Sequence, residues 1–341
     1  MENEKKSNKR LSRRGFLQIV AVAGAAVGCW KLGLFGAAEK LQVVRRSQPI
    51  MGTILNLTIY GPDRDQCEEA VTEMLATMQG LEAKMSRHMA SSDLSTLNRT
   101  GLLQNPDKDL LKVLNLAQTI SRQSSGSFDV TILPLLTIHE EGNGNTDTVA
   151  APHYNAAKSL VGYEKLIINQ DKLQLRDPGM RVSLDGIGKG YIVDKGIASL
   201  KNYGFHNVFV EAGGDLMVSG RKEDNSPWRI GIRNPRPEQK RKLVTLQVSD
   251  KAVATSGDYF QPFTPDFKNH HIIDPRSGFS PPELASCTVT APSVALADGL
   301  ATAVMVLGKD ATLDLLEPMG GCEAYMVTKD LKEYHTTGFF S

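Results

Sequence analysis

The chain has 341 residues, of which 23% are charged, and its composition is that of an ordinary globular protein. Seven of the 39 Lys and Arg residues and two of the 38 Asp and Glu residues lie in residues 1–38, so the remainder carries a net charge of −4. A mildly acidic body gives no support for nucleic-acid binding. The length allows one large domain or two smaller ones.

The N-terminus has the pattern of an export signal. A basic start is followed by an apolar run from Ile19 to Gly28, which is shorter than the roughly 20 residues that cross a bilayer. Within this segment, "SRRGFL" (residues 12–17) resembles the twin-arginine signature; a chance basic cluster before a membrane anchor is the alternative. We therefore expect residues 1–38 to be a twin-arginine-type signal and residues 39–341 to act on the periplasmic side of the inner membrane.

The cysteine pattern bears on lipidation and on metal binding. Cys29 follows "AAVG", which makes it a candidate lipoprotein cleavage site and lipid anchor, although the Leu expected three places earlier is Ala26. None of the four cysteines has CxxC spacing, which disfavours zinc. We interpret Cys287 and Cys322 as buried, apolar side chains.

Periodicity along the mature chain predicts helices and strands in irregular alternation. Apolar residues at helical spacing predict helices within residues 65–84, 106–126, 155–161, 194–204 and 293–308. Alternating or β-branched runs predict strands within residues 41–61, 165–177, 207–220, 228–235, 243–259 and 287–292, and residues 140–152 read as a loop. The hairpins favour an α+β fold over a doubly wound parallel sheet.

The segment "SLDGIGKGYIVDKG" (residues 183–196) is typical of a turn that approaches a phosphate. It is not a Walker loop, because Lys189 is followed by Gly190. It is not a Rossmann fingerprint, because Gly186, Gly188 and Gly190 give G-x-G-x-G. Free amides, a helix dipole and Lys189 nevertheless favour an anion. Glycines that merely permit a tight strand-to-helix turn are the alternative.

A second element predicts a cation next to that anion. In "ALADGLATAVMV", Asp298 and Thr302 are four residues apart, so they share one face of a helix. A carboxylate and a hydroxyl are hard ligands that suit Mg²⁺. The alternative is that Thr302 bonds back to the carbonyl of Asp298. Just upstream, "HHIIDPRSG" supplies His271 and Asp274, and "VEAGGD" (residues 210–215) indicates a tight turn.

These elements occur together and in this order in the ApbE family, the FAD:protein FMN transferases, which the chain resembles from about residue 46 onward. The matching segments are "QPIMGT", "MSRHMASSDLSTLN", "GSFDVTILPL", "SLDGIGKGYIVD", "VEAGGDL", "WRIGIRNP", "ATSGDY", "HHIIDPRSG" and "LADGLATAVMVLG". The resemblance implies an α+β, T-fold-like architecture of mixed, largely antiparallel sheets with packed helices and a flavin site between them.

The resemblance also implies an activity and its partners. The implied reaction is the Mg²⁺-dependent transfer of FMN from FAD to a threonine hydroxyl of an acceptor flavoprotein, with release of AMP. The implied acceptors are subunits of membrane redox complexes of the Rnf or Na⁺-pumping NADH:quinone oxidoreductase type.

Site residues follow from the same resemblance by motif position. Asp298 and Thr302 look like side-chain metal ligands, and Gly186 looks like a ligand through its backbone carbonyl. The positions implied to contact FAD are Met51, His88, Ser127, Phe128, Asp129, Ser183, Lys189 and Ile272. Two of them depart from the family pattern, because His88 stands where Tyr or Trp is common and Ser183 stands where many relatives have Asp.

A threonine hydroxyl is a weak nucleophile and benefits from a base within hydrogen-bonding reach. His271 and Asp274 are the candidates for that base. Two other functions stay open. If water replaced the threonine, the protein would be an FAD pyrophosphatase that yields FMN and AMP. Without turnover it would be an exported flavin-binding protein, although storage needs no metal at the bond that breaks.

Overall fold

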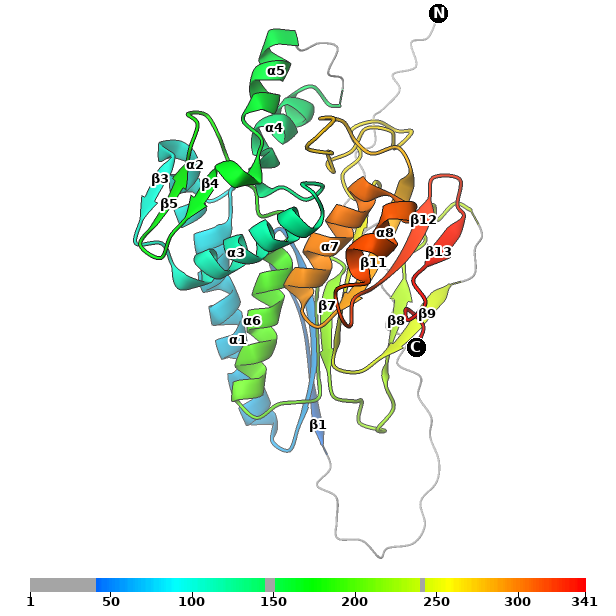
Figure 1. The fold of residues 1–341 in the computed structure, drawn as a ribbon. Helices are drawn as coiled ribbons and strands as arrows, with labels where there is room; N and C mark the ends of the chain where they lie inside the picture. Colours follow the sequence, from blue (N-terminus) through cyan, green and yellow to red (C-terminus); the bar gives the residue numbers. More distant parts are fainter. Residues whose placement is uncertain (1–40, 145–150, 240–242) are drawn as a thin grey trace, which may run out of the picture.

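The computed structural model describes residues 41–144, 151–239 and 243–341, so the predicted export signal and Cys29 lie outside the described residues. An eight-stranded antiparallel sheet runs through the centre of the molecule, in the order β1-β2-β6-β7-β10-β11-β12-β13 (Figure 1). Its strands are β1 (Gln42–Ile50), β2 (Thr53–Gly61), β6 (Val208–Ala212), β7 (Asp215–Ser219), β10 (Lys251–Gly257), β11 (Leu284–Ala291), β12 (Glu323–Thr328) and β13 (Glu333–His335).

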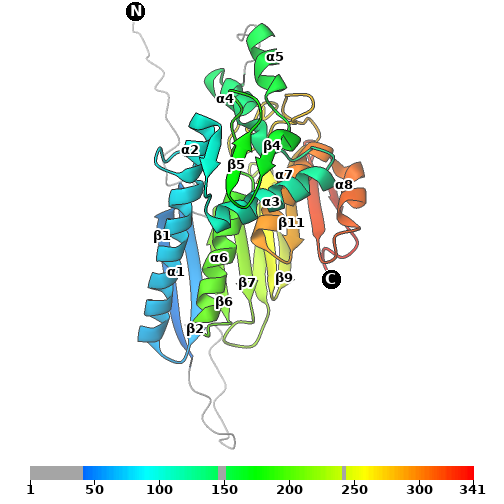
Figure 2. The same cartoon turned by 60° about the vertical axis from the view of Figure 1, so that its left-hand side comes forward.

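Three helices cover one face of this sheet. They are α1 (Arg64–Met85), α6 (Gly188–Asn202) and α7 (Val294–Leu307). Helix α6 packs between α1 and α7, and α7 lies against β10 and β11 (Figures 1 and 2). The main apolar core fills the space between these helices and the sheet. Because the beginnings of α6 and α7 meet over the middle of the sheet, side chains from both helices can reach one site.

A smaller hairpin covers part of the opposite face. It consists of β8 (Trp228–Ile232) and β9 (Val244–Val248). Its inward side chains pack with Tyr325, Val327 and Phe339 to form a second apolar core. The sheet separates this face from α6 and α7. Successive side chains of its strands point alternately to the two faces.

Most of the remaining elements gather at one end of the central sheet, where α4 and α5 stand farthest out, and α8 packs against α7 and β12 (Figures 1 and 2). They include a three-stranded sheet in the order β3-β5-β4. These elements are α2 (Asp93–Thr100), β3 (Leu102–Gln104), α3 (Lys108–Gln123), η2 (Val130–Ile132), α4 (Leu133–Glu141), α5 (Ala151–Ser159), η4 (Tyr163–Lys165), β4 (Leu166–Ile168), β5 (Lys172–Leu175) and α8 (Lys309–Leu316).

The α+β fold with antiparallel sheets is confirmed, and so is the burial of Cys287 and Cys322, which are free thiols together with Cys67. Helix α6 begins at Gly188, before the start predicted between Tyr191 and Asp194. Helices α4 and α5 extend into residues 140–152, where a loop was predicted. The packing of α6 against α7 explains the first difference, since it favours glycines in a helical turn that propensity alone would exclude.

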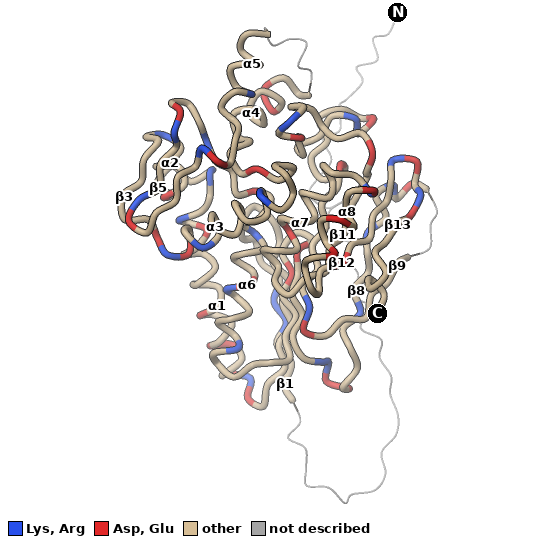
Figure 3. Tube along the Cα trace, in the orientation of Figure 1, with Lys and Arg blue, Asp and Glu red and all other residues tan. Residues whose placement is uncertain are grey.

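Charges of both signs are interspersed over the part of the chain that is described (Figure 3). Within that part, every helix is too short or too polar to traverse a lipid bilayer.

Candidate functional site

The site begins with Lys189 in the first turn of α6. Its ammonium forms an ion pair with Asp215 at the start of β7 and lies 4.0 Å from Oδ2 of Asp298 on α7. Its side chain remains 32% exposed, so the charge can also reach a ligand. Burial opposes the charge, but the two carboxylates outweigh it and raise the pKa of Lys189. This lysine therefore stays protonated at neutral pH.

Asp298 is a buried carboxylate whose charge is incompletely balanced. It is 4% exposed, and it accepts a hydrogen bond of 3.2 Å from the backbone N–H of Gly190. Its cationic neighbour Lys189 is engaged by Asp215. Burial and the negative charge of Asp215 raise the pKa of Asp298 above its ordinary value. A further cation at this position would stabilise the charged form of Asp298.

Thr302 and Gly186 meet one helical turn beyond Asp298. A Cβ atom placed on Gly186 would lie 3.1 Å from Oγ1 of Thr302 and 3.3 Å from the ring of Phe128, so the backbone of the glycine-rich turn lies against both side chains. The Thr302 hydroxyl is hydrogen-bonded to Oγ of Ser256 on β10 at 3.2 Å. The sequence alternative, a bond from Thr302 back to the Asp298 carbonyl, is not among the hydrogen bonds of the described residues.

These groups fit a small divalent cation. Among the residues described, no three His, Cys, Asp or Glu side chains cluster so as to hold a metal ion. The donors at hand are instead one buried carboxylate, one hydroxyl and backbone oxygen, a set that suits Mg²⁺ because this ion is usually held by few protein ligands together with substrate phosphates.

The segment implied to contact FAD between Ser127 and Asp129 lies beside the glycine-rich turn. Ser183 donates its backbone N–H to the carbonyl of Val130 at 2.8 Å, which joins the two segments. The Ser127 hydroxyl is buried and has no hydrogen-bond partner among the described residues, so it is available to a ligand. Asp129 accepts hydrogen bonds from Thr131 and from the backbone of Tyr163.

A cavity of about 280 Å³ opens next to this segment. Its walls combine the end of α3, the turn before β4 and the loop after His271. It is lined by Gly126, Asp129, Val161, Gly162, Tyr163, Glu164, Pro275 and Arg276.

The other residues implied to contact FAD come from three further elements. Met51 occupies the turn between β1 and β2 with a positive φ of 51°. His88 is exposed, and the preceding Arg87 pairs with Asp185 of the glycine-rich turn at 2.7 Å. Ile272 is buried in the main core. The Arg87 ion pair thus ties the segment that carries His88 to the glycine-rich turn.

The two candidate bases have different surroundings. His271 is half-buried, its buried Nδ1 has no hydrogen-bond partner among the residues described, and desolvation of the ring lowers its pKa to about 4. The opposing charges of Asp185 and Lys189 have smaller effects on this pKa than desolvation has. Asp274 instead accepts two hydrogen bonds of 2.9 Å from the backbone and side chain of Arg276. His271 therefore offers a neutral imidazole nitrogen, whereas the Asp274 carboxylate closes a turn.

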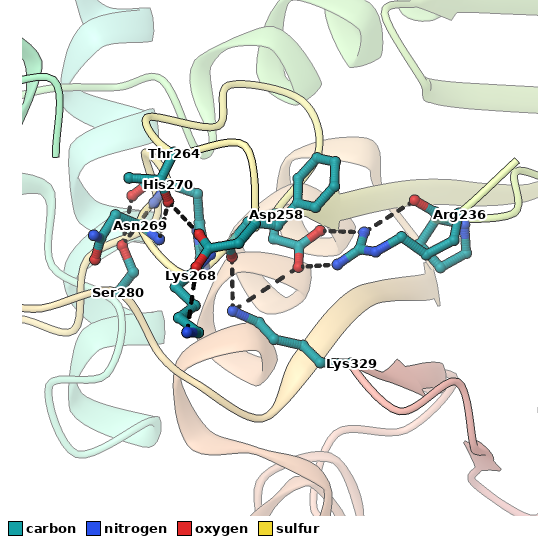
Figure 4. A network of polar contacts seen from close by, with 11 residues as sticks. Arg236, Asp258, Thr264, Lys268, Asn269, His270, Ser280 and Lys329 are labelled. Carbon is teal, nitrogen blue, oxygen red and sulfur yellow. Dashed lines mark hydrogen bonds and ion pairs between the residues drawn. The ribbon is translucent and has the colours of Figure 1, made fainter. Parts of the chain in front are cut away.

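The loop that carries His271 is anchored by a buried ionic network (Figure 4). The Asp258 carboxylate receives two hydrogen bonds from Arg236, of 2.8 and 2.7 Å. Lys329 lies 3.9 Å from the same carboxylate and donates to the carbonyl of Phe267 at 2.8 Å. Bidentate pairing of this kind fixes geometry as well as charge, so the start and the middle of the loop are held by residues that follow β8 and β12.

Sequence reasoning assigned no role to Asp215 or Ser256. Both lie in segments that it singled out, "VEAGGD" and "ATSGDY". The strand period could have placed Ser256 on the same face as Ala252 and Ala254, which pack under α7. The pairing of Asp215 with Lys189 joins residues 26 positions apart and depends on the tertiary fold.

This arrangement of side chains suits a phosphate-bearing ligand and a cation. Comparisons with known proteins identify the family of the chain. The sequence profile of the ApbE family matches residues 51–326, so this chain belongs to the ApbE family. The FAD:protein FMN transferase of Vibrio cholerae is 31% identical over 315 residues, which cover 90% of this chain and 94% of the relative. The protein of the same name from Haemophilus influenzae is 30% identical and covers 88% of this chain, matching 89% of its own length.

Solved structures share the fold. The flavin transferase ApbE from Vibrio cholerae superimposes with a TM-score of 0.76 at 29% identity, covering 88% of this chain and 98% of that structure. The apo form of the Pseudomonas stutzeri flavinyl transferase ApbE gives a TM-score of 0.76 at 30% identity, covering 91% and 99%.

Proposed function

We propose that this chain is a Mg²⁺-dependent FAD:protein FMN transferase, which moves FMN from FAD onto a threonine hydroxyl of an acceptor flavoprotein and releases AMP. The observation that carries the proposal is the cluster of Lys189, Asp215 and Asp298 beside a glycine-rich helix start, with Thr302 one turn further along α7. The names of the relatives support flavin transfer to a protein. The metal, the threonine and the release of AMP are our own extension.

In this reaction the threonine oxygen attacks the phosphorus atom of the FMN half of FAD. The bond from that phosphorus to the bridging oxygen breaks, and AMP leaves with the bridging oxygen. Phosphoryl transfer depends mainly on positioning and on neutralising charge. The protonated Lys189 and the positive end of the α6 dipole would stabilise the negative charge that develops on the departing AMP.

We assign to His271 the removal of the proton from the threonine hydroxyl. The imidazole is neutral at pH 7, so a ring nitrogen has a lone pair that can accept the proton, while desolvation makes it a weaker base than a free histidine. Asp298, Thr302 and the carbonyl of Gly186 would hold Mg²⁺, which supplies further charge neutralisation at the pyrophosphate when bound. Ser256 would orient the Thr302 hydroxyl through their hydrogen bond.

The test is a product balance with purified protein, FAD, Mg²⁺ and an acceptor that bears the threonine. We expect one AMP for each FMN attached to the acceptor, and we expect Asp298→Ala to abolish both. Free FMN in place of labelled acceptor would show a pyrophosphatase. FAD binding without any AMP would show a carrier. Unchanged labelling by Asp298→Ala would remove Asp298 from the metal site.

We further propose that the protein works after export, with twin-arginine targeting, a lipid anchor at Cys29 and acceptor subunits of membrane redox complexes. The basic, twin-arginine-like N-terminus supports this proposal. Mass spectrometry of exported proteins from cells with and without the gene tests it. We expect an FMN-sized addition on a threonine that disappears with the gene, and a labelled acceptor confined to the cytoplasm would contradict it.

A further inference from the structure

Asp194 joins α6 to the beginning of α7. Its Oδ1 accepts a hydrogen bond of 2.8 Å from the backbone N–H of Val294, and its Oδ2 accepts one of 2.9 Å from Ala295. The first amides of a helix have no partner within the helix, and a carboxylate is stabilising at that end. The N-cap of α7 is Ser293, whose side chain accepts from Leu296. Two amides of the first turn are thus capped by a residue from another helix.

The same two helices touch again one turn away. Gly190, four residues before Asp194, donates its N–H to Asp298, four residues after Val294. A Cβ atom on Gly190 would lie 2.6 Å from the carbonyl oxygen of Val294, so the two backbones are in direct contact. Contacts at two points one turn apart fix both the rotation and the sliding of α7 relative to α6. Lys189 and Thr302 extend from this junction.

We propose that Asp194 is a positioning residue of the metal site, which holds α7 in the register that brings Asp298 and Thr302 to the glycine-rich turn. The inference rests on the function proposed above and assigns a role to a residue outside the set implied to bind FAD or the cation. Removing the carboxylate leaves two amides of α7 uncapped and frees one of the two contact points. The cation ligands on α7 then lose their fixed distance from Gly186 and Lys189.

The test compares Asp194→Ala and Asp194→Asn with Asp63→Ala. Asp63 is the matched control, because its side chain caps α1 by accepting from the amides of Asp65 and Gln66. Mn²⁺ binding in the presence of FAD is measured by electron paramagnetic resonance, together with thermal unfolding and FMN transfer. Supporting groups around metal ligands change metal affinity by roughly 10- to 100-fold, and we expect a weakening of that order in Asp194→Ala.

A purely structural cap gives a different result. Asp63→Ala should lower the unfolding temperature and leave the Mn²⁺ affinity unchanged, whereas both Asp194 variants should weaken Mn²⁺ binding even where they remain folded. If Asp194→Ala does not fold, the isosteric Asp194→Asn, which retains one acceptor oxygen, decides the question.

The outcomes separate this inference from the proposed function. Wild-type Mn²⁺ affinity in the folded Asp194 variants overturns the inference while FMN transfer by the unchanged protein still stands. Weakened Mn²⁺ binding in these variants, together with a wild-type protein that labels no acceptor, supports the inference and overturns the transfer reaction. A wild-type protein that binds no Mn²⁺ overturns both.

Discussion

The backbone N–H of Gly190 donates a hydrogen bond to Oδ2 of Asp298 at 3.2 Å, which joins the glycine-rich start of α6 to α7. This bond can form because α6 has no side chain at this position. The Gly190 backbone lies directly against Val294, so the two helices approach closely enough for an amide of one to reach a carboxylate of the other. Lys189, the preceding residue, comes into range of Asp298 by the same approach.

The close contact predicts the effect of Gly190→Ala. The added methyl group would overlap the backbone of Val294, which cannot rotate away as a side chain can. We expect the free energy of unfolding to fall by about 1–3 kcal/mol, and we expect transfer to fall with it. Gly80→Ala is the control, because Gly80 lies in α1 with open space around it. We expect this substitution to raise the free energy of unfolding by roughly 0.5–1 kcal/mol. Chemical denaturation measures both, and equal stabilities would refute the contact.

Ser256→Ala tests the support of Thr302. The substitution removes the partner of the Thr302 hydroxyl, and we expect the Mg²⁺ concentration for half-maximal transfer to rise by roughly 10- to 100-fold. Thr255→Ala is the matched control on the same strand, because its hydroxyl pairs with Thr288 instead. A Mg²⁺ titration of the transfer rate checks both. An unchanged Mg²⁺ requirement in Ser256→Ala would show that this hydrogen bond does not support a ligand.

Substitution of each candidate base should show which of the two accepts the threonine proton. His271→Gln removes the neutral imidazole, and we expect the turnover rate to fall by roughly 10²–10⁴-fold while FAD still binds. Asp274→Asn should have a smaller effect, because this carboxylate is engaged by Arg276. Single-turnover transfer and FAD fluorescence titration measure the two quantities. A larger loss of turnover in Asp274→Asn than in His271→Gln would reverse the assignment.

The buried His270 predicts acid sensitivity of the fold. Burial, assisted by the charge of Lys329, lowers its pKa to about 3, whereas an unfolded histidine titrates near 6.5. Below pH 6.5 this histidine is protonated in the unfolded chain but stays neutral in the folded chain. The free energy of unfolding therefore falls as the pH decreases toward 3. Between pH 6.5 and 5 this one residue should cost about 1.5 kcal/mol. Denaturation at both pH values should show a smaller acid loss for His270→Gln, and an equal loss would exclude His270 as the cause.

Local sequence patterns were sufficient for the β4–β5 hairpin, for α1, α3 and α7, and for the antiparallel character of the sheets, but they did not predict β3, β12 or β13. They failed at the start of α6, because propensity disfavours Gly188 and Gly190 in a helix and only the contact with α7 favours them there. The same limit applied to Asp215, since an ion pair that spans the fold leaves no periodic signal. Asp298 and Thr302 could be predicted as a pair because helical spacing alone places both on one face.

The central claim is that a divalent cation binds between the Asp298 carboxylate, the Thr302 hydroxyl and the backbone of Gly186, next to the pyrophosphate of FAD. Anomalous diffraction from crystals grown with FAD and Mn²⁺ locates that cation directly. We predict an anomalous peak in contact with Asp298 and Thr302. A bound FAD whose Mn²⁺ peak lies away from both residues, or that has no peak at all, would contradict the account.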